Sequence, residues 1–175
     1  MAEKTALYSL PGHSYCMSAR ILAIDPGSRN MGWAVLDSEG KLIDWGTIKT
    51  KPKTPQPETL LILLQALEDL VAKFHPSRLA LEDLFFSRNV RSAMRVGEAR
   101  GMVLLICAQH DLPHESFTPQ KIKMVLTGSG KADKDQIADA VEKHLGIRPP
   151  SQHAGDAACA ALCMLELEKE QSAAA

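Results

Sequence analysis

Apolar runs and short polar breaks divide the first fifty residues into three expected strands. Residues 20–25 (RILAID) form an apolar run that ends in an acid, residues 31–37 (MGWAVLD) carry apolar side chains on both faces, and residues 42–50 (LIDWGTIKT) form a third run. Turns separate them at residues 27–30 and at the sequence SEGK. The pattern predicts a hairpin meander at the start of the domain.

Helical periodicity dominates the rest of the chain. A proline-rich loop at residues 51–57 precedes a strongly amphipathic segment, and Pro57 near its start and Lys73 in its last turn are typical of a helix. Two short apolar runs, at 78–84 and 112–118, predict further strands. Additional helices are predicted over residues 89–110, 119–127, 132–146 and 153–168, with Thr118 capping the second of these and Gly146 ending the third.

The resulting order is strand, strand, strand, helix, strand, helix, strand, helix, helix, helix. This order predicts an α/β fold, a mixed five-stranded sheet flanked by helices. A chain of 175 residues that is 45% apolar suits one domain. We expect that domain to span residues 20–168, between an N-terminal extension (1–19) and a C-terminal tail (169–175), and Met17 is a candidate natural start.

The charge of the chain is unevenly distributed, although the formal net charge is only -1. Residues 86–134 hold 8 Lys and Arg against 4 Asp and Glu, whereas residues 135–175 hold 3 against 7. At short range a phosphate backbone interacts with the local charge of the segment that it contacts, so a locally basic segment can attract it. The balance therefore allows a nucleic-acid partner despite the near-neutral total.

Two further features indicate a cytoplasmic protein. No apolar stretch reaches the roughly 18 residues that span a bilayer, and the N-terminus lacks the basic start and apolar centre of a secretory signal. The four cysteines are too sparse for a disulfide framework, so we expect reduced, mostly buried thiols.

Three acids occupy comparable positions in the expected elements. Asp25 ends the first strand, Glu82 lies in a later strand, and Asp156 is in the first turn of the last helix. Acids on neighbouring strands can converge at the strand ends, and buried carboxylates repel one another unless a cation such as Mg²⁺ or Mn²⁺ neutralises them. His153 shares a helix face with Asp156. Each acid alone has a bland explanation, such as a turn former before Pro26, so the combination carries the prediction of a divalent metal site.

Four segments of the chain resemble the RuvC Holliday-junction resolvases. They are ILAIDPGSRNMGWAV, LALEDLFFSRNVRSAMRVGEARG, FTPQKIKMVLTGSGKADKDQI and HAGDAACAAL, in the family's order and spacing, and they cover about residues 20–165. The resemblance implies a ribonuclease-H-like fold, a homodimer, and symmetric paired nicking of four-way DNA junctions with divalent metals. It also implies work beside the RuvA and RuvB branch-migration proteins in homologous recombination and DNA repair.

The resemblance places the family's acids on Asp25, Glu82 and Asp156. The position three before the last acid is an aspartate in some members and is His153 here. Two metal ions roughly 4 Å apart would flank the scissile phosphate, with Asp25 bridging, Glu82 on one ion, and Asp156 and His153 on the other. Hydrolysis would leave a 5′ phosphate and a 3′ hydroxyl. Because imidazole is a borderline ligand, we expect Mn²⁺ to support cleavage better than Mg²⁺.

Aromatic and basic side chains beyond Glu82 are the expected DNA contacts. Phe85 matches the family's base-contacting aromatic, and Lys123 and Lys134 fall where the resemblance places DNA-contacting lysines. The complete set, chosen because aromatics stack on bases and cations hold phosphates, is Phe85, Phe86, Arg88, Arg91, Lys121, Lys123, Lys131 and Lys134.

Other interpretations remain open at this point. One is a junction-binding module whose metal site has decayed, with His153 as its only support, and another is a ribonuclease-H-like nuclease with a different substrate. Gly97 and Gly101, one turn apart, predict either close packing inside the fold or a dimer contact. The TGSGK sequence does not fit a Walker loop, because Val125 and Ala132 stand where that pattern needs Gly and Ser or Thr.

Overall fold

A five-stranded mixed sheet forms the middle layer of the computed structural model, which describes residues 19–83 and 90–174. The strand order across the sheet is β3-β2-β1-β4-β5. The strands β1 (Ile21–Asp25), β2 (Asn30–Leu36) and β3 (Leu42–Lys49) form an antiparallel meander. The strands β4 (Arg78–Glu82) and β5 (His114–Phe117) extend the sheet parallel to β1.

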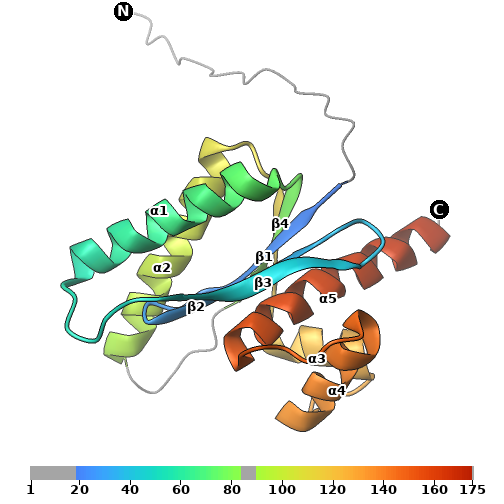
Figure 1. The fold of residues 1–175 in the computed structure, drawn as a ribbon. Helices are drawn as coiled ribbons and strands as arrows, with labels where there is room; N and C mark the ends of the chain where they lie inside the picture. The colour runs from blue at the N-terminus through green and yellow to red at the C-terminus, as the bar shows by residue number, and fades with distance from the viewer. Residues whose placement is uncertain (1–18, 84–89, 175) are drawn as a thin grey trace, which may run out of the picture.

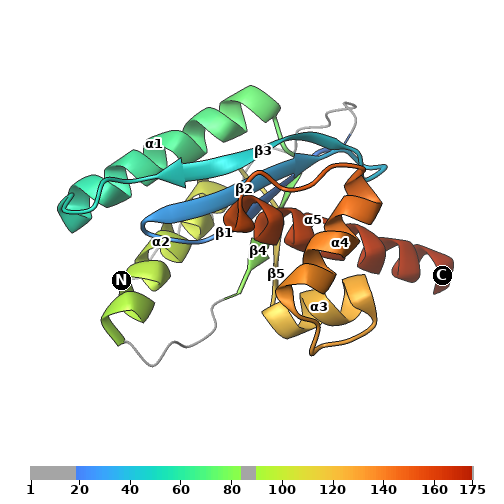
Figure 2. The same cartoon turned by 60° about the horizontal axis from the view of Figure 1, so that its bottom comes forward.

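Helices cover both faces of this sheet, which gives the fold three layers (Figure 1). One face is covered by α1 (Gln56–Phe74) and α2 (Val90–Gln109). The other face is covered by α5 (Gln152–Ala174), with α3 (Pro119–Thr127) and α4 (Lys134–Leu145) packed beside it. Figure 2 shows α3 and α4 below α5, on the side of the sheet away from α1.

The predicted order of ten elements is confirmed within the described residues, and so are two predicted helix ends. The Thr118 hydroxyl accepts a hydrogen bond from the Lys121 N–H at the start of α3, and Gly146 ends α4 in the left-handed conformation. The structure adds a capping box at the start of α4, where Asp133 and Gln136 exchange hydrogen bonds with each other's backbone.

The C-terminal boundary differs from the expectation. Residues 169–175 were expected to form a tail, but α5 continues to Ala174. The segment contains no helix breaker, and Lys169 pairs with Glu166 at 2.8 Å, an (i, i+3) spacing that supports a helix. The residues of alternating charge that follow the apolar stretch therefore form the exposed end of α5. Of the expected N-terminal extension, only Ala19 lies within the described residues.

The alternation of side chains along two central strands places two acids on one face of the sheet. In β1, Leu22 and Ile24 pack against α1 and α2, whereas Ile21 and Ala23 pack on the α5 side. Because successive side chains of a strand point to opposite faces, the Asp25 side chain points to the same face as Ile21 and Ala23, toward α5. In β4, Ala80 lies on the α5 side and Leu79 and Leu81 on the other, so Glu82 also points toward α5.

Small side chains allow α5 to lie close to the sheet. The helix contributes several fully buried alanines, and Ala23, Ala34 and Ala80 face it from three neighbouring strands. At Gly32 in β2 the approach is closest, because a Cβ at this position would overlap the backbone carbonyl of His153. Within the described residues, no helix combines the length and the apolar character that spanning a membrane requires.

Candidate metal centre and DNA-binding surface

Asp25 and Glu82 meet at one edge of the sheet because their strands are parallel neighbours. The register of β1 and β4 pairs Ile24 with Leu81, one residue before each acid. The carboxyl ends of both strands therefore lie side by side, and both side chains point toward α5. The two carboxyl groups are close enough for each to shift the pKa of the other. The sequence-predicted convergence of these two acids is what the structure shows.

The start of α5 brings the other two predicted residues to the same edge. Ser151 caps the helix by accepting a hydrogen bond from the Ala154 N–H at 3.1 Å, and its hydroxyl also bonds the Thr47 hydroxyl of β3 at 2.7 Å. The helix begins at Gln152, so Asp156 lies at the start of the second turn instead of the first. His153 and Asp156 stay on one face, turned toward Asp25.

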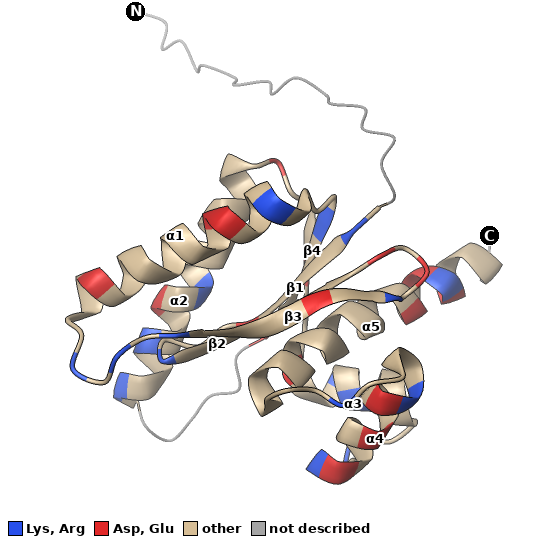
Figure 3. Cartoon of the chain, in the orientation of Figure 1, with Lys and Arg blue, Asp and Glu red and all other residues tan. Residues whose placement is uncertain are grey.

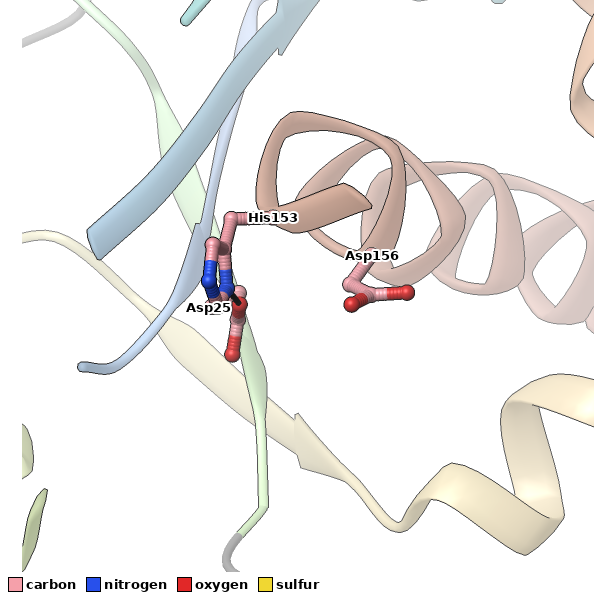
Figure 4. Close-up of side chains that lie close together, drawn as sticks. All are labelled: Asp25, His153 and Asp156. Atoms are coloured by element: carbon pink, nitrogen blue, oxygen red, sulfur yellow. Dashed lines mark hydrogen bonds and ion pairs between the residues drawn. The ribbon is translucent and has the colours of Figure 1, made fainter. Parts of the chain in front are cut away.

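Asp25, His153 and Asp156 form a compact group at this edge (Figure 4). One possible ligand atom from each lies within 4.8 Å of the others. The His153 Nδ1 atom lies 2.8 Å from Asp25 Oδ2, and because an ionised carboxylate only accepts hydrogen bonds, Nδ1 is the donor of this contact. The Asp25 side chain is 17% exposed and that of His153 is 41% exposed, so the cluster is reachable from outside.

The three carboxyl groups of the cluster have raised pKa values, so each is harder to ionise than an exposed carboxyl group. Burial, followed by repulsion from Asp25 and Asp156, raises the pKa of Glu82 to about 8. Burial and repulsion from Asp25 raise the pKa of Asp156 to about 6. Burial also raises the pKa of Asp25, although the His153 hydrogen bond opposes that shift. The arrangement therefore concentrates negative charge that the protein itself does not neutralise.

This donor set fits a divalent cation. Three carboxylates and one imidazole offer the hard oxygen and borderline nitrogen atoms that Mg²⁺ and Mn²⁺ accept, and a cation would relieve the repulsion that raises the carboxyl pKa values. Asp25 is the central member, because it contacts both Glu82 and His153.

A cavity of about 440 Å³ opens from the cluster toward α3 and α4. Glu82 and Asp156 line its inner end, and Ile122, Ile137 and Val141 contribute apolar wall. Two of the predicted DNA-binding lysines, Lys123 and Lys134, line the same cavity. The structure therefore places two cations at the approach to the carboxylates, where a phosphate group could be held.

The remaining predicted DNA contacts lie at different positions. Lys121 and Lys131 are exposed on α3 and the following loop, and Arg91 is exposed in the first turn of α2. Phe85, Phe86 and Arg88 lie outside the described residues.

Sequence reasoning missed Gln152. Its side chain hydrogen-bonds the Asp156 carboxylate, and its Oε1 accepts a hydrogen bond from Lys134 Nζ at 3.2 Å. The amide thus links a candidate metal ligand to a candidate phosphate contact. The four-residue spacing of Gln152 and Asp156 on one helix was the available signal.

The geometry also bears on the two glycines of α2. Apart from their own helix and chain neighbours, no described heavy atom comes within 4 Å of a Cβ built on Gly97 or Gly101, so within the described residues these glycines do not serve close packing against another element.

Comparison with known proteins connects this geometry to an activity. The family described as "Crossover junction endodeoxyribonuclease RuvC" matches residues 21–164. Proteins with that name from Chloroflexus aggregans and Desulfitobacterium hafniense are 40% and 39% identical, over 82% of this chain and 91% and 90% of theirs. The structure of Thermus thermophilus RuvC in complex with a Holliday junction substrate is similar at a TM-score of 0.81 and 27% identity, covering 87% of this chain and 96% of that one. The yeast mitochondrial resolvase Ydc2 shares the fold, at a TM-score of 0.54.

The raised Glu82 pKa predicts how the stability of the metal-free protein depends on pH. The folded state keeps a proton that the unfolded chain releases, so this contribution is present below pH 4.5 and is lost as the pH rises through about 8. Glu82→Gln removes the group without changing its shape. In EDTA we expect the variant to melt several degrees above the wild type at pH 8 and close to it at pH 4.5.

Differential scanning calorimetry across this pH range measures the effect. Glu39→Gln, at an exposed turn position, is the matched control and should follow the wild type. A difference between Glu82→Gln and the wild type that is the same at every pH would contradict the assigned cause.

Proposed function

The chain belongs to the RuvC family of crossover junction endodeoxyribonucleases, and we propose that it resolves Holliday junctions by metal-dependent phosphodiester hydrolysis at Asp25, Glu82, His153 and Asp156. The observation that carries this proposal is the convergence of these four side chains, from two strands and one helix, beside a cavity lined by lysines. A divalent metal requirement is consistent with the acidic cluster.

Asp25 is proposed as the shared ligand of two divalent ions. Its contacts on one side with Glu82 and on the other with His153 support this, with Asp156 near His153. When bound, such ions supply positive charge that activates a water molecule and stabilises the departing 3′ oxygen. Glu82 would serve one ion, and Asp156 with His153 the other. In-line attack gives a 5′ phosphate and a 3′ hydroxyl.

The lysines of the cavity are proposed to hold the cleaved strand. Lys123 and Lys134 line the cavity with Glu82 and Asp156, so a phosphate attracted to them is brought to the carboxylate cluster. Further phosphate contacts are assigned to the exposed Lys121, Lys131 and Arg91. Base contacts by Phe85 and Phe86, and a phosphate contact by Arg88, stay predictions from the family resemblance.

A stripe of exposed residues on α2 supports the proposed homodimer. Val90, Met94, Gly97, Gly101 and Leu105 follow one another at intervals of three or four residues and therefore share a helix face. Val90 is 69%, Met94 63% and Leu105 49% exposed. Apolar surface with two glycines between is suited to close approach of the same helix from a second copy about a two-fold axis. Symmetric nicking of two strands needs such a pair of sites.

Work beside the RuvA and RuvB branch-migration proteins stays a prediction from family membership. The contact surfaces for these partners are not assigned to residues of this chain. The cytoplasmic location expected from the sequence is likewise kept as a proposal.

The role of Asp25 is tested by Asp25→Asn. We expect the variant to bind a synthetic four-way junction with unchanged affinity and to lose nicking by at least about 10²-fold, because an essential carboxylate contact is gone. Nicks are mapped on the junction and on a linear duplex of matching sequence, in the presence of divalent metal. Wild-type protein should nick the junction symmetrically and leave the duplex intact.

Asp69→Asn, at an exposed position of α1, is the control and should cut like the wild type. Junction binding without cutting by the wild type would instead indicate a non-catalytic binding module. Equal cutting of junction and duplex would indicate a nuclease with a different substrate range.

The imidazole ligand predicts a preference between metals. At saturating concentrations of each ion, we expect faster single-turnover nicking in Mn²⁺ than in Mg²⁺, because a borderline nitrogen ligand suits Mn²⁺ better. His153→Asp should lower the ratio of the Mn²⁺ rate to the Mg²⁺ rate. Calorimetric titration of each ion into both proteins provides a readout independent of cleavage. An equal or higher wild-type rate in Mg²⁺ would overturn the prediction.

The dimer proposal is tested at Gly101. A Cβ there comes within 4 Å of no described atom beyond its own helix and chain neighbours, so Gly101→Glu is expected to leave the monomer folded. A charged group at the proposed interface prevents close approach, so sedimentation should show a shift from dimer to monomer and paired nicking should become single. Gln171→Glu, exposed near the end of α5, adds the same charge elsewhere and should remain dimeric. A Gly101→Glu protein that is still a dimer places the interface on another surface.

A further inference from the structure

A second group of cations lies at the end of the sheet, on the opposite side of β1 from α3 and α4. The turn after β1 carries Arg29, and the end of β3 with the following loop carries Lys49, Lys51 and Lys53. We call these four residues the β-end cluster. Residues 26–36 and 45–57 contain these cations and no acidic residue. Figure 3 shows blue segments gathered where β2 begins, β3 ends and the loop to α1 follows.

Hydrogen bonds hold the two segments of the β-end cluster together as one surface. The Thr50 N–H donates to the Arg29 carbonyl at 3.1 Å, and the Thr50 hydroxyl donates to the Ser28 carbonyl at 2.9 Å. The Arg29 guanidinium in turn donates to the Lys51 carbonyl. Thr50 is buried, whereas Lys49, Lys51 and Lys53 are exposed. Arg29 therefore holds the two segments together, and the three lysine side chains are accessible to a ligand.

The strand register places the β-end cluster at the same end of the sheet as the carboxylate cluster. Lys49 pairs with Asn30, and Gly32, two residues further along β2, pairs with Asp25. The sheet order places β2 and β3 on one side of β1, and β4 and β5 on the other, and β5 leads directly through Thr118 into α3, which carries Lys123. The β-end cluster and the cavity lysine Lys123 thus lie on opposite sides of Asp25 in the sheet order.

The charges of the β-end cluster are not neutralised by the protein. Elsewhere in the described part of the chain, Lys73, Arg78, Arg100, Arg148 and Lys169 form ion pairs with carboxylates. Across residues 19–83 and 90–174, no carboxylate pairs with Lys49, Lys51 or Lys53. Three exposed lysines in a segment without acids form a local positive field that attracts a polyanion.

We propose that the β-end cluster is a second phosphate-binding surface, which holds the DNA arm on the side of the cut opposite to the phosphates held by Lys123. Lys49 ends β3, and Lys51 and Lys53 lie in the turn that follows, where the Thr54 N–H donates to the Lys51 carbonyl at 3.2 Å. Three cations so close together in the chain can contact neighbouring phosphates of one DNA strand, which carries a charge roughly every 3.4 Å along the axis. This inference rests on the proposed function, because the ligand is the backbone of the junction that the enzyme cuts.

The test measures the salt dependence of junction binding. In an Asp25→Asn background that prevents cutting, Lys51→Gln/Lys53→Gln should bind the junction about tenfold more weakly. The slope of log affinity against log salt between about 50 and 200 mM KCl should fall by roughly 1.8, or about 0.9 for each lost phosphate contact. The control Lys41→Gln/Lys143→Gln removes the same charge at two exposed positions away from the cluster. It should keep the parent slope.

A hydroxyl-radical footprint locates the contact. Lys51→Gln/Lys53→Gln should lose protection on one side of the scissile phosphate, and Lys123→Gln on the other side.

Each contrary outcome has a separate meaning. Three outcomes would overturn the proposal that the β-end cluster binds phosphates. They are an unchanged slope of log affinity against log salt, an equal loss of affinity in the Lys41→Gln/Lys143→Gln control, and lost protection on the same side as in Lys123→Gln. Wild-type protein that does not nick the junction would instead overturn the proposed function. Matching melting temperatures of the variants exclude misfolding as the cause.

Discussion

The close approach of α5 to β2 at Gly32 is the constraint on which the site depends. Gly32 is the register partner of Asp25, and the His153 backbone lies where a side chain at position 32 would be. Only because this position lacks a Cβ can the helix start lie directly over the end of β1. The hydrogen bond between the Ser151 and Thr47 hydroxyls then fixes the helix start along the strands. A displacement of about 1 Å here would move the ligand set out of register with Asp25.

With the backbone fixed in this way, electrostatics decides what the site can hold. Burial raises the pKa values of Glu82, Asp25 and Asp156, and repulsion from Asp25 raises those of Glu82 and Asp156 further. A fourth carboxylate at position 153 would add to that repulsion, whereas the imidazole donates a hydrogen bond to Asp25 and adds none. The metal-free cluster is therefore poised between binding protons and binding cations, and a divalent ion competes with protons for the same oxygens.

The sequence predicted the arrangement of elements well because local patterns specify it. Apolar alternation marks the strands, and caps such as Thr118 mark helix boundaries. The same alternation is enough to place Asp25 and Glu82 on one face once their strands are known to be neighbours. Two features depended on tertiary packing and were not predictable: the close approach of α5 at Gly32 and the contact of Gln152 with Lys134. The exposed glycines of α2 illustrate the same limit, since a small-residue spacing does not say which backbone approaches it. The extension of α5 to Ala174 had local support in the spacing of Glu166 and Lys169, so the helix end expected at residue 168 was wrong for a local reason.

Selectivity for a branched substrate has to come from shape, because phosphate contacts carry no sequence information. In the sheet order, the cavity lysine Lys123, on the helix that follows β5, and the proposed β-end cluster lie on opposite sides of Asp25, so a substrate gains from both only if its backbone passes the carboxylates and continues in both directions. A straight duplex presents its phosphates along one axis. At a junction the strands diverge at the crossover, and each arm can follow its own set of cations. We therefore expect each surface alone to bind weakly and without selectivity, and the two together to discriminate by the angle between the arms.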